Sequence, residues 1–309
     1  MTETPSKLRV LVTGASGFLG RHLLKSLADF DVTALYSSST TFIADFPHIR
    51  SCTLDLSDAA ATRALVTQCS PDAVIHLAAV SSPAACERAP DETTAINAPS
   101  ALIETLSPTA FVIFLSTDQV YDGTVGKYTE ESDAAPVNAY GRSKLAFEGA
   151  LARALPSRSV SLRSSLILGG RAPGCAAKQS FLQFCDERLA TGEVTEFFLD
   201  EVRSVVWVGD IVATITHFLR NGVSAETAGV YNMGGPEPVT RVQIGRAVAA
   251  HRGYNLELVA AVKRADVVPP TAVASPPDIS MDSAALRRIT GSQPATTLAQ
   301  MLAAAFSAC

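Results

Sequence analysis

Tyr140 and Lys144 stand four residues apart in the segment NAYGRSK (138–144), so on a helix their side chains share one face. A tyrosine hydroxyl titrates near pH ~10, which is too high for ready proton exchange at neutral pH. A neighbouring ammonium group stabilises the phenolate and lowers that pKa. Thr117 ends an apolar run, FVIFLST (111–117), where its hydroxyl could bind a substrate oxygen. We therefore predict that Thr117, Tyr140 and Lys144 are catalytic and exchange a proton with a carbonyl or alcohol oxygen.

A glycine-rich segment near the N-terminus predicts a dinucleotide site. In VTGASGFLG (12–20) the glycines have GxxGxxG spacing, between an apolar run and an amphipathic stretch. The first permits a tight turn, the second lets backbone amides approach a pyrophosphate, and the third allows helix and strand to pack closely. We expect cofactor contacts from Gly14, Ser16, Gly17, Phe18, Leu19, Gly20 and Arg21. Together with the Tyr–Lys pair, this segment predicts hydride transfer between a nicotinamide and a carbonyl carbon.

The end of the second expected strand favours NADP(H) over NAD(H). An Asp or Glu there binds the 2′-hydroxyl of NAD and repels a 2′-phosphate, but residues 36–40 read YSSST. The Ser37 hydroxyl could donate to that phosphate, and Arg21 could supply a cation or be an exposed first-turn arginine. Asp55 and Leu56, after the third expected strand, are candidates for the adenine side, although Asp55 could equally be a turn residue.

The elements that must position these residues follow from hydrophobic periodicity. Near-continuous apolar runs predict strands at 8–13, 32–37, 51–56, 73–79, 111–117 and 159–165, with helices at 18–28 and 57–68. Such strands are typical of a parallel sheet that helices cover on both faces, so we predict a doubly wound α/β Rossmann fold.

After about residue 170 the alternation loosens. Further helices are expected at 179–189, before 220, at 240–251 and at 296–307, with a late strand and loop at 229–235 and a proline-rich loop at 267–278. We expect an NADP-binding domain over 1–170 and a smaller substrate-binding part over 171–309, with segments near 203–235 returning to the core. The smaller part should lie over the carboxyl edge of the sheet.

Bulk composition limits the possible functions. The chain has 309 residues and a net charge of −5, so it offers no basic field for nucleic acid or anionic membrane. Its apolar stretches are about one strand long, and the N-terminus lacks the long apolar run of a signal peptide. The six cysteines form no CxxC pair, which predicts reduced thiols and no metal site. We expect a cytoplasmic protein.

Several motifs together resemble the extended short-chain dehydrogenase/reductase family. They are TGASGFLG (13–20), HLAA (76–79), Asn97, STDQVYDG (116–123), YGRSK (140–144) and LRSS (162–165). STDQVYDG followed by NAYGRSK is similar to the dTDP-4-dehydrorhamnose reductase branch, whose pattern reads STDYVFDG. That branch also contains the regulatory β subunit of methionine adenosyltransferase.

The resemblance implies roles for further residues. Backbone after Leu77 and around 164–166 would face the cofactor's ribose and nicotinamide. His76 is either a cofactor-side hydrogen-bonding group or a core histidine, and Asn97 braces the active-site strands. The implied cofactor contacts are Leu77, Ala78, Ala79, Tyr140, Lys144, Ser164 and Leu166, and the implied substrate contacts are Thr117, Asp118, Gln119 and Arg203.

Two departures from the family pattern lie on the substrate side. Gln119 stands where the branch usually has an aromatic residue, and SPPD (275–278) replaces an arginine-bearing RPxN stretch. Arginine is the natural clamp for diphosphate oxygens, so its loss weakens the case for a nucleotide sugar. Arg203 and Arg171 remain as alternative cations.

Three functions follow as hypotheses. The first is NADPH-dependent reduction of a keto group, on a 4-keto-6-deoxy nucleotide sugar or a related ketone. The second is a non-catalytic regulatory subunit with bound NADP(H), whose partner would be a methionine adenosyltransferase catalytic subunit. The third is an NAD-dependent sugar-nucleotide epimerase or dehydratase; Asp118 partly fits a dehydratase, but Gln119 does not supply the second acid. A homodimer is a further possible assembly.

Overall fold

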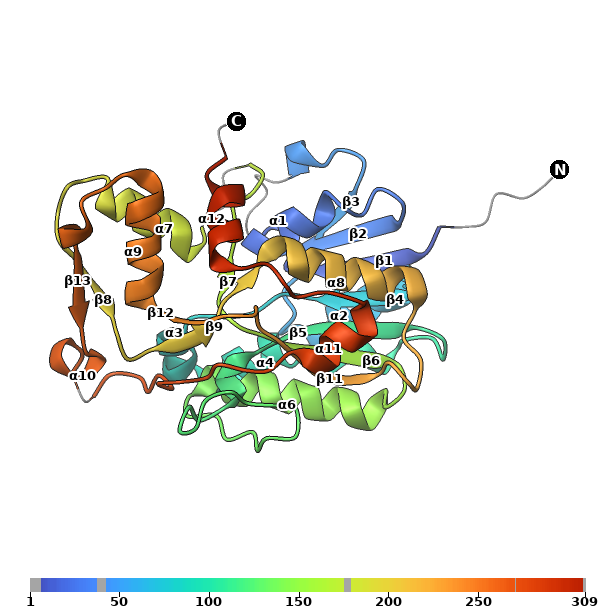
Figure 1. Ribbon diagram of the computed structural model, residues 1–309. Helices are drawn as coiled ribbons and strands as arrows, with labels where there is room; N and C mark the ends of the chain where they lie inside the picture. Colours follow the sequence, from blue (N-terminus) through green and yellow to red (C-terminus); the bar gives the residue numbers. More distant parts are fainter. Residues whose placement is uncertain (1–6, 38–42, 175–178, 270, 308–309) are drawn as a thin grey trace.

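A parallel sheet of seven strands forms the centre of the fold, in the order β11-β6-β5-β4-β1-β2-β3 (Figure 1). The computed structural model describes residues 7–37, 43–174, 179–269 and 271–307. From one edge to the other, the strands are β11 (Gly229–Met233), β6 (Ser159–Ser164), β5 (Phe111–Thr117), β4 (Ala73–His76), β1 (Arg9–Thr13), β2 (Asp31–Tyr36) and β3 (Arg50–Thr53). This arrangement confirms the predicted Rossmann-like α/β fold.

Helices cover both faces of the sheet because its side chains alternate between two apolar layers. Val10 and Val12 point to one layer, and Leu11 between them points to the other. The first layer packs under α1 (Phe18–Leu24), α8 (Val208–Asn221) and α11 (Ala284–Thr290). The second packs under α2 (Ala59–Cys69), α5 (Ala101–Glu104) and α6 (Ala139–Ala154). In Figure 1, α8 crosses the middle of the view, below β1, β2 and β3, and α6 lies below β5 and β6.

A second lobe, at the left of Figure 1, has its own apolar core. That core contains Leu182, Ile244, Val248 and Met301. Its elements are α7 (Phe181–Leu189), β8 (Thr195–Phe198), α9 (Arg241–Arg252), β13 (Val259–Val262), α10 (Arg264–Val267) and α12 (Leu298–Ala305). Short strand pairs join the lobe to the sheet side: β7 (Ile167–Leu168) with β10 (Val206–Trp207), and β9 (Val202–Ser204) with β12 (Pro238–Thr240).

Several elements differ from the sequence predictions in length. Helix α1 ends at Leu24 rather than residue 28, because Ser26 and Leu27 donate to the carbonyls three residues earlier and turn the chain toward β2. Short helices were missed by the sequence predictions. They include α3 (Pro83–Arg88) and α4 (Pro90–Asn97), each with proline in its first turn, as well as α5, α10 and α11. The 3₁₀ turns are η1 (Ile43–Asp45), η2 (Asp118–Val120) and η3 (Leu256–Leu258).

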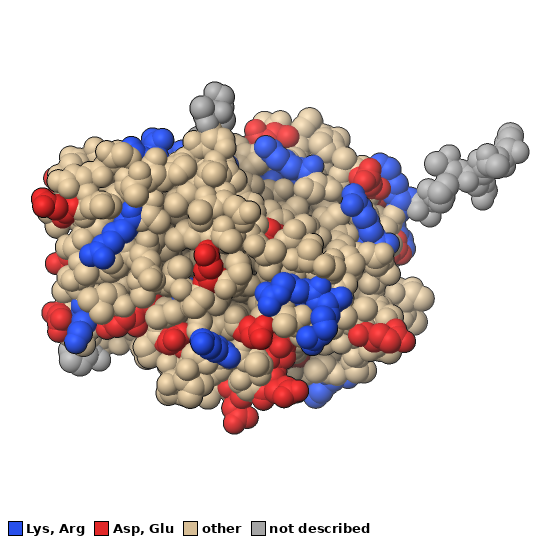
Figure 2. Space-filling view, viewed as in Figure 1, with Lys and Arg blue, Asp and Glu red and all other residues tan. Residues whose placement is uncertain are grey.

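The surface carries charges of both signs. Figure 2 shows Lys and Arg side chains interspersed with Asp and Glu on one face, with no field of a single sign there. Among the described residues, no helix is both long and apolar enough to cross a membrane.

Candidate active site

A cavity of about 1350 Å³ lies where β1, β4, β5 and β6 end, and it continues between the sheet and the second lobe. All the residues predicted to bind cofactor or substrate line it, with the single exception of Arg21. The carboxyl ends of parallel strands meet at one edge of a sheet, so distant segments converge there. Sequence motifs spread over about 190 residues are thereby brought to one site.

The glycine-rich loop is packed too tightly for side chains. Gly14 has a φ of +69°, and a Cβ on it would lie 2.6 Å from the backbone nitrogen of Ala78. A Cβ on Gly20 would lie 2.5 Å from the Gly14 carbonyl oxygen. The loop therefore packs tightly against the backbone that follows β4, and the first turn of α1 packs tightly against the loop. This close packing leaves the backbone around Gly17 facing the cavity, as a pyrophosphate site requires.

His76 belongs to the core beneath the cavity. Its Nδ1 lies 2.8 Å from the Thr13 hydroxyl, which itself accepts hydrogen bonds from the backbone amides of Leu77 and Ala78. The Thr13 proton therefore goes to Nδ1, and Nε2–H donates to the Asn97 carbonyl at 3.4 Å. Burial lowers the pKa of His76 to about 3, so the ring is neutral. Of the two interpretations left open by the sequence, the structure supports the core histidine.

Asn97 holds the loop after β4 against α6. Its side-chain oxygen accepts from the Val80 amide at 2.8 Å, and its Nδ2 donates to the Ser143 hydroxyl at 2.9 Å. Asn97 is fully buried, which agrees with a bracing role.

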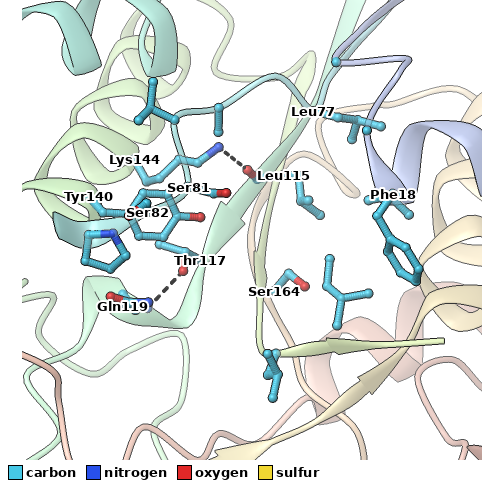
Figure 3. A pocket seen from close by; sticks show the side chains of 18 of the residues that line it. Phe18, Leu77, Ser81, Ser82, Leu115, Thr117, Gln119, Tyr140, Lys144 and Ser164 are labelled. Carbon is cyan, nitrogen blue, oxygen red and sulfur yellow. Dashed lines mark hydrogen bonds between the residues drawn. The ribbon is translucent and has the colours of Figure 1, made fainter. Parts of the chain in front are cut away.

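Thr117, Tyr140 and Lys144 meet at the centre of the cavity (Figure 3). Thr117 ends β5, and α6 starts at Ala139, with Asn138 as its N-cap. A Cβ on Gly141 would overlap the carbonyl oxygen of Gln119 and lie 2.8 Å from the Pro136 Cβ. Glycine at this position therefore lets the start of α6 pack directly on η2, which brings Tyr140 beside Thr117.

The electrostatics of the trio are set by burial. Burial raises the pKa of the Tyr140 hydroxyl, and a hydrogen bond with the Thr117 side chain offsets part of that rise. Burial lowers the pKa of Lys144 to about 7, while the Glu148 carboxylate opposes that shift. The Lys144 ammonium group donates to the Leu115 carbonyl at 2.8 Å and lies 4.6 Å from the centre of the Phe114 ring. Burial therefore dominates the Tyr140 pKa in this structure, and its lowering by Lys144 together with an oxidised nicotinamide stays a prediction.

A buried ion pair stands behind the trio. Glu148 receives hydrogen bonds from both ends of the Arg163 guanidinium group, the shorter at 2.8 Å, and from the Ser116 hydroxyl at 2.5 Å. Arg163 also donates to the Tyr121 hydroxyl at 2.9 Å. Glu148 and Arg163 are almost fully buried, so each neutralises the other inside the sheet.

Asp118 and Gln119 follow Thr117 in η2. The Asp118 carboxylate accepts from the hydroxyls of Ser165 at 2.9 Å and Thr117 at 3.3 Å, and burial raises its pKa. The backbone amide of Gln119 donates a hydrogen bond to the Thr117 hydroxyl at 3.2 Å. Both residues line the substrate side of the cavity.

Three arginines surround one glutamate where the cavity reaches the second lobe. Glu201 lies 3.9 Å from Arg203, 3.8 Å from Arg241 and 3.4 Å from Arg264. Arg203 is buried and donates to the carbonyls of Val202, Pro276 and Pro277. The cluster leaves an excess of positive charge on the cavity wall.

Sequence reasoning identified Arg203 but missed Arg241 and Arg264. Arg241 follows the N-cap Thr240 of a capping box, a local signal for the first turn of a helix. Nothing in the sequence indicated that this turn faces the cavity. Arg171, the other candidate, pairs with Glu187 at 2.9 Å on the exposed surface and does not line the cavity.

Arg21 does not have the predicted position at the cofactor. Its side chain is fully buried, donates to the Ser16 and Pro173 carbonyls at 2.9 and 3.1 Å, and lies 3.6 Å from Asp45. It connects the glycine-rich loop, η1 and the loop after β7, because all three approach α1. Ser37 lines the cavity, whereas Ser38 to Thr40 lie outside the described residues.

Asp55 acts as a turn residue. Its carboxylate accepts from the Ser57 amide at 2.9 Å and from the Ser57 hydroxyl at 2.7 Å, and these bonds lower its pKa. Asp55 and Leu56 nevertheless line the cavity.

None of the described cysteines lines the cavity. Cys52, Cys69, Cys86 and Cys185 are free thiols, and Cys175 and Cys309 lie outside the described residues. Within the described ranges, no group of His, Cys, Asp and Glu side chains is arranged to hold a metal ion.

Known proteins resemble this chain along most of its length. The RmlD substrate binding domain model matches residues 8–306. The probable low-salt glycan biosynthesis reductase Agl14 of Haloferax volcanii is 30% identical over 268 residues, which cover 84% of this chain and 86% of that protein.

Two further similarities cover different amounts of the chain. The methionine adenosyltransferase 2 subunit beta of Xenopus tropicalis is 34% identical over 146 residues, which cover 46% of this chain and 42% of that protein. The crystal structure of a hypothetical dTDP-4-dehydrorhamnose reductase from Sulfolobus tokodaii has 26% identity and a TM-score of 0.79, covering 94% of this chain and 97% of that one. The chain therefore belongs to the RmlD substrate-binding domain family, the dTDP-4-dehydrorhamnose reductase family of the extended short-chain dehydrogenases/reductases.

Proposed function

We propose that this protein reduces a keto group on a nucleotide sugar, with NADPH as the hydride donor. The observation that carries the proposal is that Thr117, Tyr140 and Lys144 line one cavity together with a glycine-rich loop and an arginine cluster. One end of that cavity fits a dinucleotide, and the other end offers cations to a phosphorylated substrate.

The glycine-rich end fits the cofactor. Its backbone is free of side chains at Gly14 and Gly17, and the space a Cβ would need at Gly14 is filled by the backbone of Leu77 and Ala78, directly after β4. The loop can therefore meet a pyrophosphate through backbone N–H groups. NADP is favoured over NAD because Tyr36 and Ser37 end β2 without a carboxylate to repel a 2′-phosphate.

Proton transfer falls to this chain's own side chains. A bound reduced nicotinamide supplies the hydride that reduces the carbonyl carbon. Tyr140 holds its proton at neutral pH, because burial raises its pKa, and donates it to the carbonyl oxygen that receives the electron pair. Thr117 places its hydroxyl on the same oxygen. Lys144, which lines the same cavity, would hold the ribose hydroxyls of the nicotinamide cofactor.

The arginine cluster supports an anionic substrate. Arg203, Arg241 and Arg264 carry three positive charges close to two carboxylates, those of Glu201 and Asp118. Guanidinium groups bind the oxygens of a diphosphate through paired hydrogen bonds, so this wall of the cavity favours an anionic substrate. These residues compensate for the absence of arginine at 275–278.

NADPH oxidation in the presence of a dTDP-4-keto-6-deoxyhexose tests the proposal directly. We expect turnover by the wild type, loss of kcat by about 10²-fold or more in Tyr140→Phe, and a raised KM for the sugar nucleotide in Arg241→Gln with the KM for NADPH unchanged. Absence of turnover with several nucleotide sugars, despite tight NADPH binding, would refute the reductase.

A second candidate is a regulatory subunit that holds NADP(H) without turning it over. The similarity to methionine adenosyltransferase 2 subunit beta favours it, although that match covers less than half of either protein. The retained trio does not separate the two functions. Co-purification with a methionine adenosyltransferase catalytic subunit, together with absence of ketone turnover, would decide for the regulator. A dehydratase is disfavoured, because Gln119 follows Asp118 where a second acid would be needed.

A further inference from the structure

The orientation of the Gln119 carboxamide group is determined by Asn138. Asn138 is fully buried and caps α6, so its Oδ1 accepts a hydrogen bond from the Gly141 amide at 3.0 Å. This contact fixes which side-chain atom of Asn138 is oxygen and which is nitrogen. The nitrogen, Nδ2, donates to the Ala274 carbonyl at 3.1 Å and to Gln119 at 2.8 Å. Because Nδ2 has no lone pair to offer, the Gln119 atom it meets is Oε1. The helix cap thus sets the orientation of the Asn138 carboxamide, and Asn138 in turn sets the orientation of the Gln119 carboxamide.

The same logic leaves the Gln119 Nε2 group as a donor at the cavity. No described residue accepts a hydrogen bond from Nε2, and Gln119 is half-buried on the cavity lining. Its backbone amide is bound to Thr117 at 3.2 Å, which anchors it next to the catalytic hydroxyl. Figure 3 shows Gln119 beside Thr117 and Tyr140. A donor that is already oriented before the substrate arrives loses little entropy on binding.

We propose that Gln119 determines substrate specificity by donating a hydrogen bond from Nε2 to an oxygen on the ring carbon next to the reacting carbonyl. This inference rests on the proposed reductase function and goes beyond it by naming the substituent that is recognised. For a 4-keto-6-deoxyhexose the substituent is the hydroxyl on carbon 3, since carbon 5 carries the methyl group and no oxygen other than that of the ring. An aromatic residue at this position, as in STDYVFDG, has no amide donor to offer.

The expected discrimination follows from an unpaired donor. A substrate without the neighbouring oxygen leaves Nε2 desolvated and unbound, which costs roughly tenfold or more in kcat/KM. The effect should appear as a ratio between two substrates, because any general loss of affinity acts on both.

The test compares a 4-keto-6-deoxyhexose dTDP sugar with its 3-deoxy analogue, in wild type, Gln119→Glu and Gln119→Met. Gln119→Glu keeps the size and the oxygen that faces Asn138 but replaces the donor by an acceptor. Gln243→Glu is the matched control: it makes the same chemical change on α9, at the exposed third position of a capping box where Glu is accepted. We measure kcat/KM for both ketones and Kd for both corresponding alcohols by calorimetry.

We expect the wild type and Gln243→Glu to prefer the 3-hydroxy member about tenfold or more, and both Gln119 variants to lose most of that preference. Absence of a preference in wild type, or an unchanged preference in the Gln119 variants, overturns the inference. Failure of the reductase function has a different signature: neither ketone is turned over, while the preference is still read from the binding of the two alcohols.

Discussion

The contact between Gly141 and η2 makes Gly141→Ala a sharp test of how the catalytic trio is positioned. A Cβ at residue 141 would overlap the Gln119 carbonyl oxygen and lie 2.8 Å from the Pro136 Cβ. The overlapping atom belongs to the backbone, so a rotamer change cannot relieve the clash. Either the start of α6 or η2 must move. Tyr140 is on one of these elements, and Thr117 immediately precedes the other.

The size of the effect follows from the displacement needed. Restoring a normal van der Waals separation requires a shift of about 1 Å, and a misplacement of that size costs roughly 10²-fold in rate. Overpacking costs about 1–3 kcal/mol of stability, from which about 1 kcal/mol is recovered by the better helix propensity of alanine. We therefore expect a net destabilisation of up to about 2 kcal/mol and a much larger relative loss in kcat.

Gly149→Ala is the matched control on the same helix. A Cβ at residue 149 would meet only the terminal nitrogen of Arg153, at 3.3 Å, and that long side chain can move. We expect this variant to keep wild-type kcat and to gain up to about 1 kcal/mol in unfolding free energy. NADPH oxidation gives kcat, and guanidinium unfolding monitored by circular dichroism gives stability for both variants.

Equal behaviour of the two alanine variants would refute this reasoning. In particular, wild-type kcat in Gly141→Ala would mean that α6 does not need its contact with η2 to position Tyr140. A large loss of kcat in Gly149→Ala would mean that the effect comes from the helix as a whole.

Three further outcomes can be measured. Glu148→Leu should lower the unfolding free energy by about 3–5 kcal/mol, because Arg163 is left buried without its carboxylate partner. Adding Arg163→Leu should recover most of that loss, as measured by chemical denaturation. Wild-type stability of Glu148→Leu alone would contradict the role of the buried pair. Lys144 has a pKa of about 7 in the folded protein and near 10.5 when unfolded, so the unfolded chain binds more protons between these values. Stability should therefore rise with pH in that window by up to ~1.4 kcal/mol per unit, and Lys144→Met should remove this rise, whereas identical pH slopes would count against the shift. Arg21→Met should lower stability but leave the ratio of the Kd values for NADPH and NADH unchanged, because the Arg21 guanidinium group faces Asp45. If the variant lost a preference for NADPH, Arg21 would have to contact the cofactor.

The parts of the site that were predictable from sequence are those encoded within a few consecutive residues. The glycine-rich loop is a single turn before α1, and Tyr140 and Lys144 lie on a single helix, α6. The sequence spacing of these residues alone therefore specifies their geometry. The alternation of strands and helices likewise predicted the parallel sheet, because each unit buries its own apolar residues. Strand and helix ends were less accurate, since capping and turn bonds such as those after Leu24 decide them.

The parts that were not predictable depend on packing between distant segments. Arg241 and Arg264 reach Glu201 only because α9 and α10 fold over the cavity edge. Arg21 is next to the glycine-rich loop in sequence, yet Asp45 and Pro173 draw its side chain into the core. The orientation of Gln119 depends on Asn138, whose own orientation follows from the helix that it caps.

Strand β11 has a consequence for the order in which the protein can be built. It pairs with β6 from Gly229↔Val160 to Met233↔Ser164, and its Asn232 side chain bonds to Tyr121 and Tyr128. On the ribosome, the edge of β6 stays unpaired until about 65 more residues have been added, which takes roughly 3–13 s at ordinary translation rates. During that time the nascent sheet exposes an open edge, where it is most prone to pair with another chain. The central sheet is thus completed after α7 and β8 of the second lobe have been synthesised, but before α9, β13, α10 and α12.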